Sequence, residues 1–399
     1  MSCTTTTSSA STTATDTSVT TTTTTMPNDQ PSSGKSTSRK KKNIISKENN
    51  SYYGLLSSPN IKRVTLGKYE FETWYGNAAY FNPNDVAHTC LGYEYSNKVA
   101  QDPSLRKLFR SSSVNNNNNN SNNNNNLTSQ QGENGFQYWL DHLYVCEYCF
   151  KYTTNEQELS QHVQLCKYNK PRPTIGKLLY RDDISGPYMI REIQGFKNTL
   201  FCQNLCLFGK LFLDDKSVYY SIDHFNFYVL YGYDLSDEYP RNFKPMGFFS
   251  KEVLSYDNDN NLACICVFPS YQRRRLGSLL IEFSYALARV TPGQYRSGPE
   301  FPLSPYGKVT YLRFWSKKLA YLILQKKKLQ QEITLVELSN ETGFRKEDIL
   351  YTLEYTQCLH FDSNNDVQLS LPNLEKWCLE NSINPSRDIP LLKQECLVI

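Results

Sequence analysis

The chain has 399 residues, of which 21% are charged, and a formal net charge of +4 at neutral pH. Such a small basic excess gives little long-range attraction for nucleic acid, so any contact with DNA must come from a local patch. The sequence holds no apolar run of about 18 residues, and its start lacks the apolar core of a secretory signal. We therefore expect a soluble intracellular protein whose 12 cysteines do not form a disulfide framework.

Residues 1–52 are rich in Thr and Ser and poor in large apolar side chains. They cannot bury enough surface to offset the entropy of an ordered chain, so we predict a disordered tail. The basic run Arg39–Lys42 has the form of a nuclear import signal, although four basic residues in such a tail are also often only solvated charge. The Asn-rich tract at 111–135 is predicted to be a second disordered segment that loops out of the surface.

Residues 64–74 alternate with the period of a β-strand, which marks the start of the folded region. The motif Cys146-x2-Cys149-x12-His162-x3-Cys166 follows the Asn-rich tract. Three thiols and an imidazole at this spacing are typical of a tetrahedral zinc site, with the first pair on a hairpin knuckle and the second pair one helical turn apart. Four ligands leave no open position, so the zinc is predicted to be structural.

Three apolar segments rich in β-branched and aromatic residues lie between 198 and 233, and two more lie at 246–254 and 262–268. We predict them as strands of a sheet, with Cys202 and Cys206 in the first. Pro269 ends the last strand because it has no N–H for the ladder. From Leu276 onward, apolar side chains recur on one helical face, so a helix follows directly.

The turn before this helix, Gln272–Gly277, is basic. Its N–H groups would lie at the positive end of the helix dipole, where a pyrophosphate is favoured, although a plain solvated loop can have the same pattern. Beyond residue 311 the pattern becomes helical. Thr334–Glu337 has the form of a capping box and Gly343 breaks the pattern, which indicates a helix-turn-helix.

The segment 261–278 resembles the acetyl-coenzyme A motif of the MYST-family histone acetyltransferases, whose outline is Ala-Cys-Ile-Leu-Thr-Leu-Pro-x-Tyr-Gln-Arg-x-Gly-x-Gly-Lys. The similarity extends from about residue 61 to 360, with further blocks in the family order at 191–195, 201–207, 210–220 and 298–304. Within the family, the Arg-Leu-Gly turn and the Ser-Gly-Pro-Glu loop are most similar to the catalytic subunit of a silencing complex that acts on the histone H4 tail.

The resemblance implies an α+β fold with a general N-acetyltransferase (GNAT-like) core. Strands and a Cys-Cys-His-Cys zinc finger precede this core, and a helix-turn-helix module follows it. The implied division of the chain is 61–180 for the N-terminal part with its finger at 146–166, 181–310 for the acetyl-coenzyme A-binding core, 311–385 for the helical part and 386–399 for a tail.

The resemblance also assigns roles to single residues. Glu300 matches the family's general base, which takes a proton from a lysine ammonium so that the neutral amine can attack the thioester. Cys264 matches the active-site cysteine, for which a covalent acetyl-cysteine and direct attack in a ternary complex both remain open, and Lys216 matches the autoacetylated lysine. The expected contacts of acetyl-coenzyme A are Ile265 and Val267 with the pantetheine arm, Gln272, Arg273, Arg274, Arg275, Leu276, Gly277 and Ser278 with the pyrophosphate, and Ser304.

The chain departs from the motif at three positions, where Arg275 replaces a glycine, Ser278 a lysine and Val267 a threonine. Glycine tolerates positive φ and lets the backbone approach a phosphate, so an arginine must turn its side chain away or substitute a guanidinium contact. Arg275 therefore motivates one alternative to an active enzyme, a catalytically weak or silent scaffold subunit.

The resemblance predicts a nuclear histone lysine acetyltransferase with no membrane association, acting on the H4 tail or the nucleosome within a chromatin-modifying complex for silencing or transcription regulation. A second alternative is a DNA-binding module built from the zinc finger and the helix-turn-helix. We do not expect direct sequence-specific DNA reading, and we favour non-specific nucleosome contact through Lys326–Lys328.

Overall fold

The structure is a computed structural model, and it describes residues 55–56, 58–82, 85, 90–101, 138–184, 187–213, 221–234, 236–238, 241–253, 259–361, 367–384 and 390–399. They belong to the compact unit Lys47–Ile399. The predictions for the 1–52 tail with its Arg39–Lys42 run, for the Asn-rich tract at 111–135 and for Lys216 lie outside the described residues. Within the described part of the chain, no helix is both long and apolar enough to cross a bilayer.

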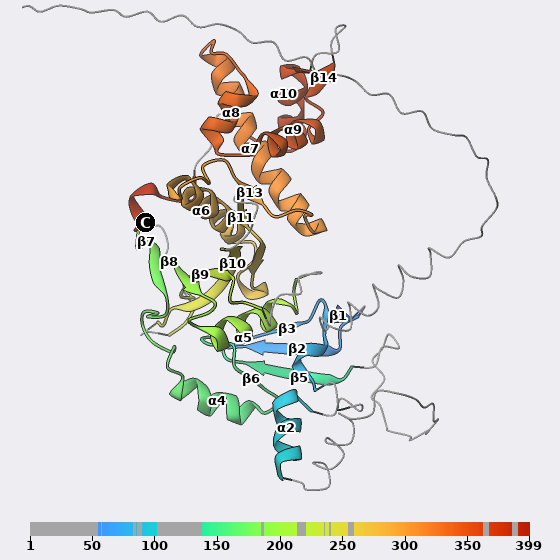
Figure 1. Ribbon diagram of the computed structural model, residues 1–399, viewed down its shortest axis with the longest axis vertical. Helices are drawn as coiled ribbons and strands as arrows, with labels where there is room; N and C mark the ends of the chain where they lie inside the picture. Colours follow the sequence, from blue (N-terminus) through green and yellow to red (C-terminus); the bar gives the residue numbers. More distant parts are fainter. Residues whose placement is uncertain are drawn as a thin grey trace, which may run out of the picture. The chain divides into compact units, whose positions relative to one another are not determined.

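The central sheet has five antiparallel strands in the order β12-β10-β9-β8-β7 (Figure 1). Its central members are almost wholly buried, which suits their continuous apolar and aromatic sequences. The strand β12 lies at the edge of the sheet. The five strands are β7 (Lys177–Asp182), β8 (Tyr188–Gln194), β9 (Phe225–Gly232), β10 (Lys244–Glu252) and β12 (Cys264–Val267).

A second sheet, β3-β2-β5-β6, is built from β2 (Ile61–Leu66), β3 (Tyr69–Glu72), β5 (Leu140–Val145) and β6 (Tyr152–Thr153). The prediction of one strand over 64–74 is therefore wrong, because the chain reverses at Gly67, whose φ of +62° suits glycine. The neighbouring short elements are β1 (Leu55–Leu56), β4 (Gly76–Asn77), η1 (Ala78–Tyr80), α2 (Gly92–Gln101) and α4 (Glu156–Leu165).

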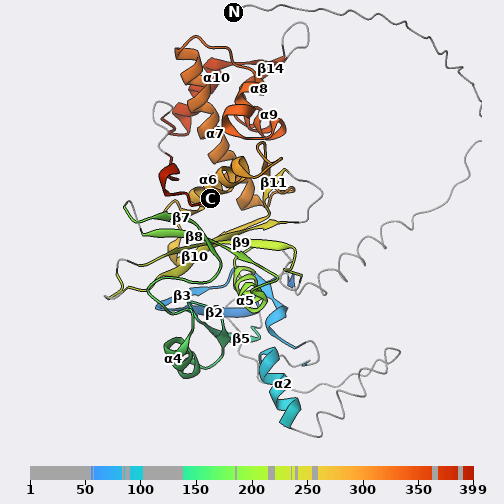
Figure 2. The ribbon, with the colours of Figure 1, turned by 60° about the vertical axis from the view of Figure 1, so that its left-hand side comes forward.

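The first apolar segment after residue 198 is the helix α5 (Thr199–Gly209), so the prediction of a strand there is wrong. Figures 1 and 2 show α5 between the two sheets, and Phe208 packs edge-on against Phe268 with ring centres 5.1 Å apart. Because α5 is covered on several sides, its sequence is apolar around most of its surface and shows no narrow helical stripe. Cys202 and Cys206 are therefore buried helix residues.

The helix predicted from Leu276 is present as α6 (Leu276–Val290) and contributes to two hydrophobic cores. Leu280 and Phe283 face the core of the sheets, whereas Ile281 and Tyr285 face a second core made by the C-terminal helices. The elements around and after it are β11 (Asn260–Leu262), η2 (Pro269–Tyr271), β13 (Gly298–Pro299), α7 (Pro305–Lys328), α8 (Leu335–Thr342), α9 (Lys346–Tyr355), β14 (Leu359–Phe361), β15 (Val367–Leu369), α10 (Leu371–Glu380) and η3 (Gln394–Cys396).

The helices α8 and α9 form the expected helix-turn-helix, with Gly343 as the left-handed C-cap of α8. The basic run Lys326–Lys328, in the last turn of α7, is partly neutralised. Lys326 Nζ lies 2.7 Å from a carboxylate oxygen of Glu341, and Lys327 Nζ lies 2.9 Å from one of Glu375. Two of the three lysines in the run Lys326–Lys328 are thus paired within the helical part, which weakens the expectation of nucleosome contact through them.

The last described residues, 390–399, pack back onto the core. The backbone N–H groups of Leu391 and Leu392 both donate to Glu282 Oε2, at 2.7 and 2.8 Å, and the N–H of Val398 donates to the carbonyl of Leu179 at 2.8 Å. The end of the chain therefore ties α6 to the edge strand β7.

Candidate functional site

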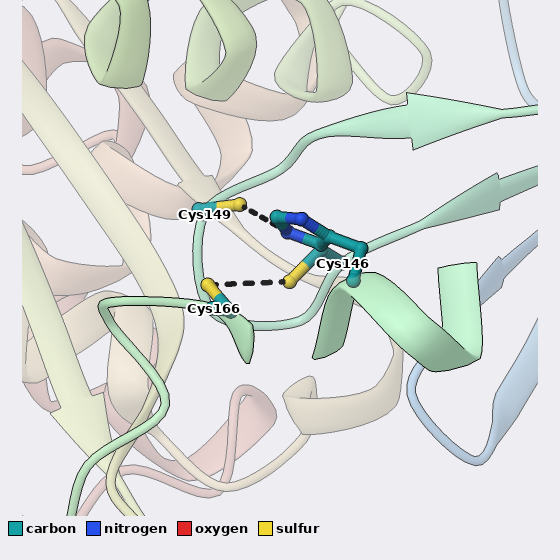
Figure 3. Close-up of side chains that lie close together, drawn as sticks. Cys146, Cys149 and Cys166 are labelled. Atoms are coloured by element: carbon teal, nitrogen blue, oxygen red, sulfur yellow. Dashed lines mark hydrogen bonds between the residues drawn. The ribbon is translucent and has the colours of Figure 1, made fainter. Parts of the chain in front are cut away.

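The four predicted zinc ligands come together in space. Cys146 directly follows β5, Cys149 lies in the knuckle, His162 lies in the last turn of α4, and Cys166 is its C-cap. Their ligand atoms all lie within 4.8 Å of one another. Cys146 Sγ is 3.9 Å from Cys166 Sγ, and Cys149 Sγ is 3.1 Å from His162 Nε2 (Figure 3).

This donor set fits a zinc ion. Three sulfur atoms and one imidazole nitrogen at these separations suit a tetrahedron with metal–ligand distances of about 2.0–2.3 Å. The knuckle is preorganised, since the N–H of Cys146 donates to Lys151 O at 2.8 Å and Phe150 adopts a φ of +62°. A zinc ion held by these four protein donors would have no free position for a substrate, so a structural role stays the prediction.

Cys264 and Glu300 come from separate sequence blocks and line one narrow pocket. Two further polar groups, Lys210 and Ser250, line it as well. Its walls are otherwise mostly apolar, being formed by Leu213, Phe225, Phe227, Phe248 and Ala263, with the thiol of Cys206. A pocket of this composition can exclude water around a small acyl group while leaving a carboxylate in reach.

Backbone pairing brings Glu300 to Cys264. The short strands β11 and β13 run parallel, with Leu262 opposite Pro299. The N–H of Glu300 donates to Leu262 O at 2.8 Å, which holds the glutamate beside the residues that lead into β12. Cys264 is fixed from the other side, since its N–H donates to Ser250 Oγ at 3.2 Å.

Lys210 is a pocket residue that the sequence analysis did not single out. It is only 4% exposed, and burial lowers its pKa to about 8. Its signal in the sequence is a lysine at the start of the apolar block 210–213, directly after the buried helix α5. The neighbouring Cys206 is buried, which raises the pKa of its thiol well above the ordinary value and makes it unreactive.

The basic turn between β12 and α6 has an unusual backbone. Arg273 and Arg275 both lie in the left-handed region, with φ of +64° and +61°. Arg275 is the N-cap of α6, and its side chain makes no capping hydrogen bond. Gln272 Nε2 donates to Val267 O at 3.0 Å, and Arg274 lies over the ring of Tyr271, 5.5 Å from its centre. Arg275 thus keeps a conformation that favours glycine.

The space beside this turn is open. A Cβ atom added to Gly277 would meet only Val267 Cγ2, at 3.8 Å. On its other edge β12 pairs with no strand among the described residues, because β13 pairs with β11. An edge strand can bond an extended amide-bearing chain, and an uncapped helix start can bond a pyrophosphate, so these residues fit acetyl-coenzyme A.

The remaining predicted coenzyme contact, Ser304, is the N-cap of α7. Its Oγ accepts a hydrogen bond from the N–H of Gly307 at 3.2 Å, and the residue is exposed. This contact explains a serine at the start of a long helix. A role of Ser304 in binding the coenzyme stays a prediction.

Comparison with known proteins identifies the family. Residues 173–396, which are more than half of the chain, match the model described as the MOZ/SAS family. The chain belongs to the MOZ/SAS family. This MOZ/SAS protein is 40% identical over 327 residues to histone acetyltransferase SAS2 of Saccharomyces cerevisiae, an alignment that covers 82% of this chain and 81% of SAS2.

Two further relatives are longer than the MOZ/SAS chain. Histone acetyltransferase mst1 of Schizosaccharomyces pombe is 38% identical over 223 residues, which are 56% of this chain and 44% of mst1. Histone acetyltransferase MOF of Drosophila melanogaster is 39% identical over 228 residues, which are 56% of this chain and 25% of MOF. The chain therefore matches less than half the length of these two. The family match and the names of these relatives identify this MOZ/SAS protein as an acetyltransferase.

Proposed function

We propose that the protein is a histone lysine acetyltransferase that takes its acetyl group from acetyl-coenzyme A, with the histone H4 tail as the expected substrate. The observation that carries the proposal is the meeting of Cys264 and Glu300 in one largely apolar pocket beside an edge strand and an uncapped helix start. The names of the relatives support histone as the substrate class and a nuclear chromatin complex as the setting.

Acetyl-coenzyme A supplies an acetyl group activated as a thioester. Glu300 would accept a proton from the incoming lysine ammonium, because an amine with a pKa of about 10.4 is almost wholly protonated at neutral pH and cannot attack. The backbone of Ile265 and Val267 would hold the pantetheine arm, and the turn Gln272–Ser278 the pyrophosphate. The pocket walls would keep water from competing with the lysine amine.

Cys264 lines the space for the acetyl group, and two routes use it differently. In one route its thiolate carries the acetyl group, whereas in the other the lysine attacks directly and the thiol only packs. Replacing Cys264 by Ala and by Ser separates these routes. Activity in the Ala variant excludes an obligatory covalent step, whereas loss in both variants with preserved folding supports it.

The experiment that tests the base is Glu300→Gln. This change keeps the shape of the side chain and removes its basicity, so turnover should fall by about 10²- to 10⁴-fold while acetyl-coenzyme A still binds. Turnover is measured with a histone H4 tail peptide and labelled acetyl-coenzyme A, and binding is measured by calorimetry. Glu354→Gln, at an exposed position on α9, is the matched control. Near-normal turnover of Glu300→Gln would contradict the assignment.

A catalytically silent scaffold is the second candidate, and Arg275 is the observation behind it. If the arginine blocks the turn, calorimetry with acetyl-coenzyme A will show no binding, and the chain is then a scaffold. The DNA-binding alternative has less support, because Lys326 and Lys327 already pair with glutamates of the helical part.

A further inference from the structure

The helix-turn-helix meets the loop that carries Glu300. The N–H of Ser297 donates to the carbonyl of Gly343 at 2.9 Å, and Ser297 also forms a β-bridge with Phe344. The loop is bound on its other side to β11, where Ser297 Oγ accepts a hydrogen bond from Asn261 Nδ2 at 3.0 Å. The residues just before Glu300 are thus held between the catalytic core and the C-terminal helices.

One side chain makes several of the polar contacts at this junction. Arg345, the N-cap of α9, donates from Nη2 to the carbonyl of Pro299 at 2.6 Å and from Nη1 to Asn260 Oδ1 at 3.2 Å. Its Nη1 also lies 3.5 Å from Asp259 Oδ2. The guanidinium therefore grips both strands of the β11–β13 pair, and one of its acceptors is the peptide group that leads into Glu300.

A buried carboxylate orients this guanidinium. Arg345 Nε donates to Asp348 Oδ2 at 3.0 Å, and the side chains are 14% and 2% exposed. The pair packs directly on Gly298, where a Cβ would come within 2.2 Å of Asp348 Oδ2 and 2.5 Å of Arg345 Nη2. Only glycine allows this approach, so the loop packs directly against the charge-assisted Arg345–Asp348 pair.

We propose that Arg345, oriented by Asp348, is a positioning residue that holds Glu300 toward the pocket it shares with Cys264. The inference rests on the proposed role of Glu300 as the base. Arg345 itself is not among the residues that line the pocket, so it acts through the Pro299 peptide group. The helix-turn-helix then serves catalysis by supporting the base, a role that requires no contact with DNA.

The test removes the Arg345–Asp348 pair without leaving a buried charge. In the double variant Arg345→Met/Asp348→Leu both partners become apolar, a change that buried ion pairs often tolerate, whereas a single change would strand one charge. The exposed pair Lys376 and Glu380 on α10, in the same helical part, gives the matched control, Lys376→Met/Glu380→Leu. Arg345→Lys keeps the positive charge but loses the planar guanidinium that donates to several acceptors at once.

We expect kcat of the double variant to fall by about 10- to 100-fold, because a small displacement of a catalytic group costs that much. The KM for acetyl-coenzyme A and the melting temperature should change little, the control should match the parent, and Arg345→Lys should be intermediate. In a Glu300→Gln background the double change should cause no further loss, since the group it positions is already gone.

Two results would overturn the inference. One is a kcat of the double variant within twofold of the parent, and the other is an equal fold loss in the parent and Glu300→Gln backgrounds, which would mean general disruption. Near-normal turnover of Glu300→Gln alone is a different result, because it removes the proposed base and the inference built on it. Melting curves and far-ultraviolet circular dichroism establish that each variant is folded.

Discussion

The helices α4 and α6 each stand at a candidate site, and they begin in opposite ways. At α4, the side chain of Asn155 accepts hydrogen bonds from the N–H groups of Gln157 and Glu158, at 2.9 and 3.2 Å. At α6, the N-cap is Arg275, whose side chain makes no capping hydrogen bond to the first turn. The first helix carries His162, one of the four ligands of the predicted zinc centre. The second follows the turn Gln272–Ser278, which is proposed to bind the coenzyme and is called the coenzyme turn below.

The difference separates stability from binding. When a side chain of the protein bonds the N–H groups of the first helical turn, these groups are stabilised and no longer available to a ligand. A start left open costs stability in the free protein and becomes favourable when an anion arrives. Changes at the zinc centre should therefore affect folding first, and changes at the coenzyme turn should affect binding first.

The largest expected effect is at the zinc centre. Cys146→Ser removes one of the four zinc ligands, a thiol that is fully buried. The protein should therefore lose its zinc and a large share of its free energy of unfolding, which is roughly 5–15 kcal/mol for a domain. Metal analysis and thermal unfolding measure the two effects. Cys396→Ser, outside the finger, is the control. An unchanged zinc content and melting temperature would contradict the structural role predicted for the four ligands.

A smaller effect, with loss of binding but not of stability, is expected from Gly277→Asp. The carboxylate would complement the dipole of α6, stabilising the fold by about 0.3–1 kcal/mol, but it would repel a pyrophosphate. We expect the Kd for acetyl-coenzyme A to rise at least about tenfold, or roughly 1.4 kcal/mol, by calorimetry.

Gln157→Asp places the same charge at the same position of α4 and should leave that Kd unchanged. An equal loss of affinity in both variants would show that the open helix start has no special role.

The smallest effect is expected from Arg275→Gly. Glycine relieves the left-handed strain of about 1–2 kcal/mol and adds an entropic cost of about 0.5–1 kcal/mol, so the net gain in the free energy of unfolding should be about 0.5–1 kcal/mol. Urea unfolding measures it. Arg275→Ala keeps the strained conformation and should show no such gain, and a loss of stability with glycine would contradict the backbone argument.

Side-chain spacing made parts of this protein predictable. Cys146 and His162 could be recognised because metal ligands recur at fixed intervals, and α6 because Leu276 and Phe283 repeat on one face. The helix α5 was missed for the converse reason, since it is apolar around most of its surface and lacks a stripe. The strands β7 and β8 were also not predicted from their sequences.

The pocket that Cys264 and Glu300 share depends on contacts between distant segments, and these leave no local pattern. Glu300 was found only through family resemblance, because a single carboxylate in a loop carries no signal of its own. Arg345 was not found, since its partners Pro299 and Asn260 lie 46 and 85 positions away. Both proposed roles depend on the tertiary pairing of β11 with β13.

The helix α6 belongs to both hydrophobic cores, with Phe283 in one and Tyr285 in the other. A helix cannot unwind along one side alone, so unfolding of either core would unfold α6 and thereby remove side chains that the other core packs against. The sheets and the C-terminal helices should therefore absorb heat in a single cooperative transition. A ligand bound at the head of α6 would raise the temperature of that transition for the whole folded unit.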